Sequence, residues 1–288
     1  MIIGHEGTIG DLKDLIARGR LGHGYIFFGP SMVGKRAVAL GLGHFLEKET
    51  FEVGPETEAL QDLKVIDIAF MRSLDADASG GSIGIDAVRE IKNFLWQKPN
   101  SSVRRTLIID NADLLTTEAQ NALLKITEEP PASSLLVLVT SDTESILPTI
   151  VSRLPKIYFG AVPKKAIEDW LAADGGIAKA KAAAFAARAL GKPGLAWRLS
   201  HDDAFRKDLE LAEKFLKSAP AARRDLVKKI IEPDDFSLRN FLDAVIMTLA
   251  WQEPSVAKAA FWHKTLRLYE GVTGFSLNPR LQLEALMK

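Results

Sequence analysis

The chain has 288 residues, of which 47% are hydrophobic and 26% are charged, a composition typical of a folded globular protein and unlike that of a disordered one. Lysine plus arginine equals aspartate plus glutamate at 37 each, so contact with a nucleic acid would need a local basic patch. The absence of cysteine excludes disulfides, thiolate nucleophiles and thiolate zinc sites.

The length predicts more than one domain, since a domain usually has roughly 100–200 residues. The first residues do not combine a basic segment with an apolar stretch, and no apolar run is long enough to span a bilayer. The sequence therefore predicts a cytoplasmic protein that makes no membrane contact.

Residues 1–160 alternate short apolar runs with amphipathic stretches, which predicts an α/β domain built on a mostly parallel sheet. Five runs rich in β-branched or aromatic residues are the predicted strands: 25–28, 65–68, 106–109, 135–139 and 156–159. Three stretches with apolar residues at spacings of three and four are the predicted covering helices: 34–46, 85–96 and 117–127. The polar segments 49–63 and 75–82 are predicted loops.

After residue 160 the alternation with strands ends. Residues 167–190 are rich in alanine and predict two short helices, within a small domain over 161–201. Helical periodicity then predicts an all-α domain over 202–288, with helices at 202–218, 223–231, 235–251 and 255–271. The predicted breaks between these helices are Ala219-Pro220, Pro233 and Pro254.

A phosphate-loop motif follows the first predicted strand and precedes a predicted helix: Gly29-Pro30-Ser31-Met32-Val33-Gly34-Lys35-Arg36. Its glycines let backbone N–H groups approach phosphate oxygens, and Lys35 can reach the outer phosphates. Arg36 stands where a serine or threonine hydroxyl normally completes the shell of a magnesium ion. Arginine does not ligate a cation but can pair with a phosphate, so we expect altered nucleotide binding and impaired metal-dependent hydrolysis.

Asp110 follows the buried run 106–109 and is the candidate carboxylate on the metal side of this site. In phosphate-loop proteins that hydrolyse nucleotides, a glutamate follows this aspartate and polarises the attacking water, but here the next residue is Asn111. An amide has no basic lone pair for that role. The alternative is that Asp110 and Asp113 only end a strand and cap a helix, and the upstream phosphate loop favours the nucleotide site.

Further segments stand in a fixed order along the chain: 85–91, 109–113, 121–131 with Glu128-Glu129-Pro130-Pro131, 147–153 with Ser152-Arg153, and 278–284 with Asn278-Pro279-Arg280. Together with the phosphate loop, they resemble the delta-prime subunits of bacterial DNA polymerase III clamp loaders, which are AAA+ proteins. The resemblance covers nearly the whole chain. It implies a RecA-like nucleotide-binding domain, a small helical lid and a helical collar through which five loader subunits associate.

In the family that the chain resembles, the loader opens a ring-shaped sliding clamp and places it on primed DNA. The implied partners are therefore motor subunits (gamma/tau), delta, the sliding clamp and, indirectly, primed DNA. Delta-prime resembles a rigid stator that offers an arginine finger to the nucleotide of a neighbouring motor subunit. By position that finger is Arg153, and a guanidinium suits the role because it stays charged. The alternative for Arg153 is a surface salt bridge.

The departures from the family pattern decide what is expected of the nucleotide site. In the family that the chain resembles, motor subunits place a nucleotide-sensing arginine at the position of Gly194. Many delta-prime subunits look to carry a four-cysteine zinc module after the phosphate-loop helix, and this chain has no cysteine, so the resemblance implies no zinc. Thr140 occupies a strand-end sensor position, with a simple cap as the alternative. The nucleotide-binding candidates are Gly29, Gly34, Lys35, Arg36, Asp110 and Thr140.

Arg36, Asn111 and Gly194 each remove a contribution to hydrolysis, which favours a non-motor subunit with no ATPase activity of its own and weak or absent binding of ATP or ADP. The retained Gly34, Lys35 and Asp110 support the alternative of an ATP-hydrolysing gamma-type motor. An unrelated P-loop kinase or helicase is a weaker alternative.

Two basic clusters are candidates for DNA contact or for solvated faces: Lys92, Lys98, Arg104 and Arg105, and Arg223, Arg224, Lys228 and Lys229. The family resemblance favours the first cluster, because it places DNA inside the ring of AAA+ domains. Apolar residues at helical spacing in the last domain, among them Phe241, Val245 and Leu249, are expected in a core or a subunit interface.

Overall fold

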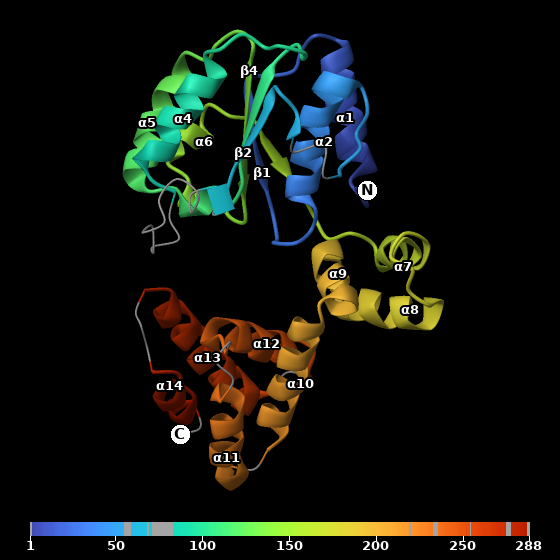
Figure 1. The fold of residues 1–288 in the computed structure, drawn as a ribbon, viewed down its shortest axis with the longest axis vertical. Helices are drawn as coiled ribbons and strands as arrows, with labels where there is room; N and C mark the ends of the chain where they lie inside the picture. Colours follow the sequence, from blue (N-terminus) through green and yellow to red (C-terminus); the bar gives the residue numbers. More distant parts are fainter. Residues whose placement is uncertain are drawn as a thin grey trace. The chain divides into compact units, whose positions relative to one another are not determined.

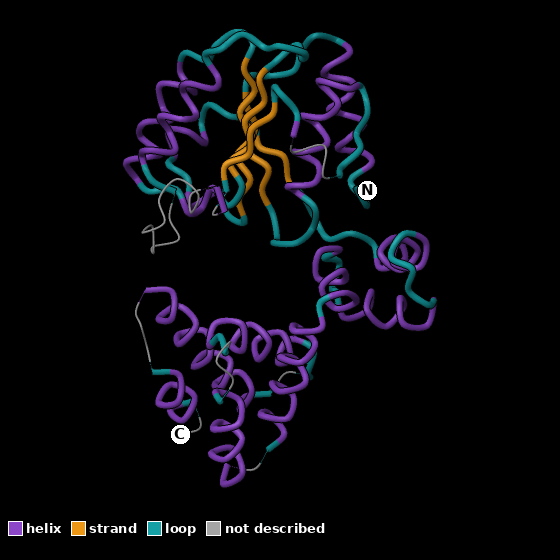
Figure 2. The backbone as a smooth tube through the Cα atoms, viewed as in Figure 1, coloured by secondary structure: helices purple, strands orange, loops and turns teal. Residues whose placement is uncertain are grey.

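Five parallel strands form one sheet in the order β2-β3-β4-β1-β5 (Figure 2). The computed structural model describes residues 2–54, 59–67, 69–70, 83–218, 220–232, 236–253, 255–274 and 278–286. The strands are β1 (Gly24–Phe28), β2 (Leu63–Ile66), β3 (Arg105–Ile109), β4 (Ser134–Thr140) and β5 (Lys156–Tyr158). Each overlaps one of the predicted apolar runs, which confirms the predicted α/β class. Residue 68, predicted as the end of β2, and the predicted loop at 75–82 lie outside the described residues.

Helices cover both faces of the sheet (Figure 1). One face carries α1 (Glu6–Ala17) and α2 (Lys35–Lys48), and the other carries α4 (Ile85–Leu95), α5 (Thr117–Glu128) and α6 (Pro148–Val151). The sheet therefore separates two hydrophobic cores, one under each layer. The helices predicted at 34–46, 85–96 and 117–127 are confirmed. Helix α1 was not predicted, and it begins at the left-handed residue His5 without a side-chain cap, so it lacks the usual start signal.

The chain divides into two compact units, residues 1–196 and 197–288. After the sheet, the first unit contains α7 (Lys164–Ala173), α8 (Lys179–Arg188) and the beginning of α9 (Pro193–His201). These helices enclose a core of their own, made largely of small side chains: Val162, Ile167, Leu171, Ala182, Ala186, Ala189 and Ala196. The alanine-rich sequence thus serves close helix packing, and the separate domain at 161–201 stays a prediction.

The second unit is helical in its described parts: α10 (Asp203–Lys217), α11 (Pro220–Ile231), α12 (Leu238–Ala250), α13 (Val256–Gly274) and α14 (Pro279–Ala285). Phe241, Val245 and Leu249 on α12 are buried, so they belong to its core. The predicted breaks at Ala219, Pro233 and Pro254 lie outside the described residues. Among the residues described, no helix combines the length and the hydrophobicity needed to span a membrane.

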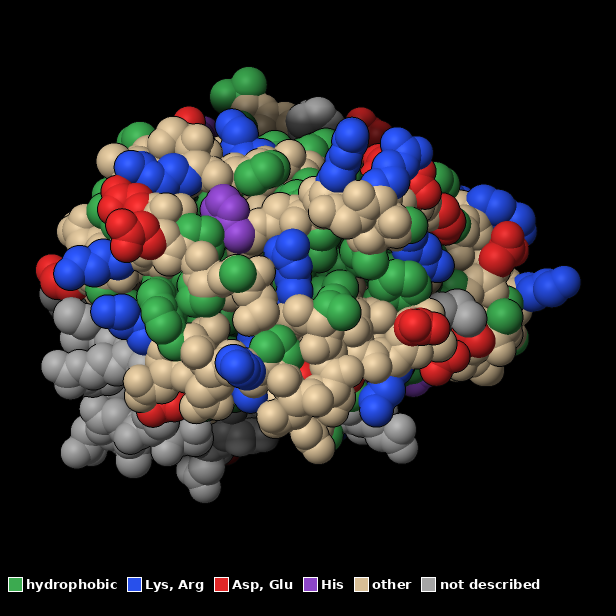
Figure 3. All heavy atoms as spheres, turned by 90° about the horizontal axis from the view of Figure 1, so that it is seen from above, with side chains coloured by type: hydrophobic (Ala, Val, Ile, Leu, Met, Phe, Trp, Pro, Cys, Tyr) green, Lys and Arg blue, Asp and Glu red, His purple; other side chains and the backbone are tan. Residues whose placement is uncertain are grey.

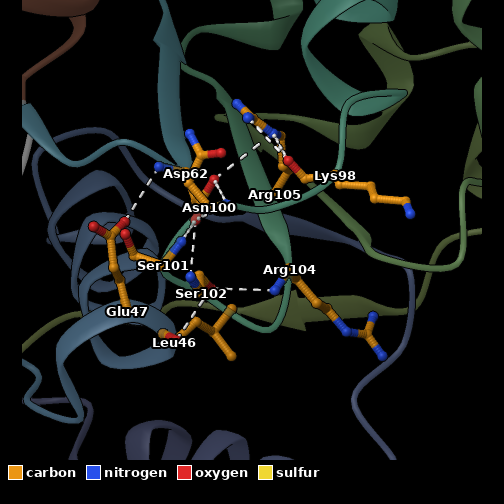
Figure 4. Close-up of polar contacts among 9 residues, drawn as sticks. All are labelled: Leu46, Glu47, Asp62, Lys98, Asn100, Ser101, Ser102, Arg104 and Arg105. Carbon is orange, nitrogen blue, oxygen red and sulfur yellow. Dashed lines mark hydrogen bonds and ion pairs between the residues drawn. The ribbon is translucent and has the colours of Figure 1, made fainter.

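A buried carboxylate ties together the amino ends of β2 and β3 (Figure 4). Asp62, just before β2, accepts hydrogen bonds from the backbone N–H groups of Asn100, Ser101 and Ser102 at 2.7–2.9 Å. Its side chain is 1% exposed and lies 3.7 Å from Nε of Arg105, the first residue of β3. The loop before β3 therefore wraps around the carboxylate and holds the two strands in register.

The same network sets the ionisation of Asp62. Burial by itself raises the pKa of Asp62, but the three backbone donors and the Arg105 guanidinium outweigh burial and hold this pKa below its ordinary value. A carboxylate whose pKa is lower in the folded than in the unfolded state stabilises the fold above its unfolded pKa, at about 4. This contribution is lost as the pH falls through the folded pKa.

We expect Asp62→Ala to lower the free energy of unfolding at neutral pH by about 3 kcal/mol, because three backbone donors and a buried guanidinium lose their acceptor. Urea unfolding at pH 7 and at progressively lower pH checks this. The difference between wild type and variant should shrink as the pH falls from about 4 towards the lower pKa of Asp62 in the folded protein, where Asp62 itself becomes protonated. A difference that is constant over this range would contradict the assigned role of the charge.

Candidate functional site

The phosphate loop joins the end of β1 to the start of α2, as the sequence predicted. Gly29 has a φ of 133°, and a Cβ there would lie 2.2 Å from the carbonyl oxygen of Phe159 just after β5. Gly34 ends the loop with a φ of 114° and caps α2 in a left-handed conformation. Both glycines are required by the backbone path, one by close approach to a neighbouring strand and both by their positive φ.

Lys35 is directed into its own loop. Its Nζ atom donates to the carbonyl oxygens of Gly29 and Pro30, each at 2.6 Å, and the residue is 6% exposed. Burial lowers the pKa of Lys35 below its ordinary value, although the carboxylates of Asp110 and Asp113 act in the opposite direction. The ammonium group thus closes the loop on itself and donates its hydrogen bonds to backbone carbonyls.

Arg36, the first residue after this lysine, reaches the carboxyl edge of the sheet. A single nitrogen, Nη1, donates to Oδ2 of Asp67 at 2.8 Å and to Oδ2 of Asp110 at 3.1 Å. The three side chains are partly buried, with exposed fractions of 32%, 21% and 16% for Arg36, Asp67 and Asp110. The guanidinium therefore bridges two carboxylates at the predicted metal side of the site.

The sheet places these two carboxylates side by side. β2 and β3 are parallel, with Ile66 opposite Ile109, and each strand is followed directly by an aspartate. The backbone N–H of Asp110 donates to the carbonyl of Ile66 at 2.9 Å, which extends the pairing to that aspartate. Asp67 was not predicted as a site residue, although its sequence context, an aspartate directly after a buried apolar run, matches that of Asp110.

Burial alone raises the pKa of Asp67, yet the hydrogen bond from Arg36, the backbone N–H groups of Ala69 and Phe70 and the charge of Arg36 outweigh it. The pKa of Asp67 consequently lies below its ordinary value, so the group is charged at neutral pH. This arrangement does not fit the magnesium ion that accompanies nucleotides in P-loop proteins. The hydroxyl ligand is replaced by a cationic side chain, and that side chain occupies the carboxylate of Asp110.

Asn111 follows Asp110 with a φ of 55°, in the left-handed region that asparagine tolerates. Its backbone N–H donates to Oδ1 of Asp110 at 3.1 Å. Its side chain is an amide where a hydrolytic site needs a carboxylate. The described residues contain no group of three or more histidine, aspartate or glutamate side chains placed to hold a metal ion.

Gly194, where the family resemblance expects a sensor arginine, contacts the phosphate loop through its backbone. Its N–H donates to the carbonyl of Met32 at 3.0 Å, and a Cβ at Gly194 would lie 3.1 Å from Cβ of Met32. Met32 itself has a φ of 63°. The first turn of α9 therefore seats directly on the loop, at a distance that a larger side chain at position 194 would disturb.

His5 adds a second tie to the loop that was not predicted. Its Nε2 donates to the carbonyl of Val33 at 2.9 Å, and its ring meets the ring of Phe159 edge to face at 4.9 Å. With the bonds from Lys35 and Gly194, four loop carbonyls accept hydrogen bonds from within the chain: Gly29, Pro30, Met32 and Val33. Sequence patterns do not predict such contacts, because the acceptors are backbone carbonyls that every residue type carries.

Thr140 ends β4 and is 1% exposed. Its hydroxyl donates to the carbonyl of Asp142 at 2.7 Å and accepts from the N–H of the same residue at 3.2 Å. The carboxylate of Asp113 lies 3.4 Å away. Thr140 thus closes the turn after the strand, and its sensor role stays a prediction.

Arg153 lies just after α6, on the face of the sheet that carries α5. Its guanidinium donates to the carbonyl of Thr149 at 2.6 Å and to Oε1 of Glu128, the last residue of α5, at 2.9 Å. The side chains of Arg153 and Glu128 are 37% and 48% exposed. The guanidinium is thus held at the surface by a partner that is itself exposed.

Two members of the first basic cluster, Arg104 and Arg105, are engaged inside the fold, whereas Lys92 and Lys98 are exposed. Arg104 donates to the carbonyls of Leu21 and Gly22 at 2.8 and 2.7 Å, and Arg105 donates to that of Lys98 besides its pairing with Asp62. These two arginines are ties between loops, and contact of the first cluster with DNA stays a prediction. On the face drawn in Figure 3, basic, acidic and hydrophobic side chains are interspersed.

In the second basic cluster, Lys228 lies 3.5 Å from the carboxylate of Asp225. The side chains of Arg223 and Arg224 lie outside the described part of the chain.

A family described as DNA polymerase III, delta subunit, matches residues 4–163, more than half of the chain. The chain belongs to this family. The delta-prime subunit of Bacillus subtilis is 33% identical over 164 residues, which cover 56% of this chain and 49% of that protein. The delta-prime subunit of Escherichia coli is 30% identical over 149 residues, covering 52% and 45%. The chain is a delta-prime-like member of the family.

A gamma/tau subunit of DNA polymerase III from Mycobacterium tuberculosis is 32% identical over 179 residues, which cover 59% of this chain and 30% of that protein. The matched segment thus spans half or less of each of these three relatives.

Solved structures support the fold. A gamma subunit-related protein of DNA polymerase III from Thermotoga maritima superposes with a TM-score of 0.62 at 22% identity, covering 96% of this chain and 97% of that chain. The ORC1 protein of Aeropyrum pernix has a TM-score of 0.51 at 15% identity, covering 100% and 92%. The fold is that of the AAA+ P-loop proteins.

The close approach at Gly29 predicts a large effect of a single methyl group. We expect Gly29→Ala to lower the free energy of unfolding by about 3 kcal/mol, because the new Cβ combines a strained φ with a clash against backbone. Gly10→Ala is the matched control, since a Cβ at Gly10, exposed on α1, would meet nothing within 4 Å. It should stabilise the protein by about 0.5–1 kcal/mol. Urea unfolding of both variants checks this, and equal effects would refute the assigned loop geometry.

Proposed function

We propose that this chain is the non-motor, or stator, subunit of a bacterial DNA polymerase III clamp loader and lends Arg153 to the nucleotide of a neighbouring motor subunit. It acts in the cytoplasm with motor subunits of the gamma/tau type, delta and the sliding clamp, and it meets primed DNA indirectly. Membership of the DNA polymerase III delta subunit family supports the place in the holoenzyme.

The observation that carries the non-motor role is the bridge from Arg36 to Asp67 and Asp110. Hydrolysis in P-loop proteins needs a metal ion to neutralise the charge that develops between the β- and γ-phosphates. A guanidinium fixed on the two carboxylates leaves no ligand set for that ion. Asn111 and Gly194 further lack the water-polarising carboxylate and the sensor guanidinium, so binding of ATP or ADP is weak or absent in this proposal.

The surroundings of Arg153 suit a residue that acts outside its own chain. Its ion pair with Glu128 is exposed on both sides, and such pairs contribute only about 0–1 kcal/mol. Arg153 can therefore exchange that carboxylate for a phosphate of the nucleotide on a neighbouring subunit with little loss of free energy. Glu128 and the carbonyl of Thr149 hold the guanidinium at the surface until the neighbour arrives, and the charge remains because arginine does not deprotonate in proteins.

A gamma-type motor is the second candidate, and a specific observation favours it: gamma/tau subunits match the chain at an identity similar to that of delta-prime subunits. Gly34, Lys35 and Asp110 are also in place. The two candidates differ in whether the purified chain hydrolyses ATP.

The isolated chain should show no magnesium-dependent ATP turnover, and Lys35→Ala should leave this unchanged. The measurement is phosphate release at increasing protein concentration, because a chain that completes its own sites by self-association would gain activity with concentration. Turnover that rises with concentration and disappears in Lys35→Ala and in Arg153→Ala would establish the motor and end the stator proposal.

In a loader reconstituted with motor subunits and delta, Arg153→Ala should reduce turnover at the one site that it serves by on the order of 10³-fold. Total ATP turnover then falls only in part, since other motor sites keep their own fingers. Arg18→Ala is the control, because Arg18 is an exposed arginine that pairs with Asp14 on α1. Gel filtration must show that both variants assemble, and undiminished turnover with Arg153→Ala would exclude the finger.

A further inference from the structure

The Arg36 side chain connects the two positions from which P-loop proteins hold magnesium. One is the residue after the loop lysine, normally one with a hydroxyl group, and the other is the aspartate at the end of another strand of the same sheet. In this chain the first position is Arg36 itself, and the second, Asp110, accepts a hydrogen bond from it at 3.1 Å. Asp67 supplies a further carboxylate at 2.8 Å from the same nitrogen.

Two carboxylates that share one donor atom repel each other strongly when no cation stands between them, especially where partial burial weakens the screening by water. Both are partly buried here, and both accept a hydrogen bond from the same nitrogen, Nη1 of Arg36. The edge of the sheet thus carries two neighbouring negative charges that the fold must neutralise. Arg36 offsets one of them with a charge that is covalently attached and cannot dissociate, and its Nη1 bridges both carboxylates.

We propose that Arg36 is a built-in substitute for the divalent cation, so that the Asp67–Asp110 pair is bridged permanently by an attached cationic group and closed to magnesium. The order of the phosphate loop and of the first turn of α2 then depends on neither metal nor nucleotide. This inference rests on the proposed non-motor role in one respect: both concern the nucleotide pocket around Arg36.

The test measures thermal midpoints of the full chain in EDTA and in millimolar Mg²⁺, without nucleotide. Wild type should give the same midpoint in both. Arg36→Thr restores the hydroxyl and removes the substitute charge, so its midpoint in EDTA should fall by about 3 °C or more and should rise when Mg²⁺ is added. Arg36→Thr combined with Asp110→Asn should be more stable in EDTA than Arg36→Thr alone and should not respond to Mg²⁺.

Arg18→Thr is the matched control, since it removes an exposed arginine with a carboxylate partner on α1 and should give no response to Mg²⁺. Electron paramagnetic resonance of added Mn²⁺ provides the direct count: none bound to the carboxylate pair of wild type and one bound in Arg36→Thr.

The proposal is overturned if wild type gains as much from Mg²⁺ as the variant does, or if Arg36→Thr is as insensitive as the control. If Arg36→Thr does not fold in EDTA, the double variant decides: restored folding supports charge neutralisation, and continued failure contradicts it. None of these readouts involves hydrolysis or assembly, so the clamp-loader role and this inference can fail separately.

Discussion

The bridge between Arg36 and the carboxylates of Asp67 and Asp110 is the interaction on which the character of the site depends. It joins the first turn of α2 to the carboxyl ends of two neighbouring strands, at the edge where parallel sheets carry their ligands. A charge that in other P-loop proteins arrives with the nucleotide is here part of the polypeptide. Both carboxylates are therefore bridged by a cationic side chain before any ligand arrives, and a metal ion that comes with a ligand meets carboxylates that already accept hydrogen bonds from that side chain.

Four carbonyls of the phosphate loop also have hydrogen-bond donors within the chain. Lys35, His5 and the backbone N–H of Gly194 donate to carbonyls of the loop. These donors come from α2, from the start of α1 and from α9, so three separate segments hold one turn of backbone. Because buried polar groups are costly when they lack partners, such a loop has a defined conformation of its own.

The sequence predicted the sheet, because its five strands are apolar runs whose burial is a local property of composition, and it located the phosphate loop through residues that are adjacent in the chain. It did not reveal Asp67, whose role depends on the register of β2 against β3, or the contact of Gly194 with Met32, which joins segments far apart in sequence. Arg104, just before β3, and Arg105, its first residue, illustrate the opposite case. As letters Arg104 and Arg105 resemble a basic patch, and only the fold shows carbonyls and a carboxylate around them.

The buried carboxylate of Asp62 lies at the amino ends of the strands, whereas the phosphate loop follows their carboxyl ends. The sheet is thus anchored at the edge remote from the pocket. A fold fastened there does not depend on the chemistry of its opposite edge, so ligand contacts can be lost or exchanged one residue at a time while the scaffold survives. With this separation, a protein that descends from an enzyme can keep the fold and lose the reaction.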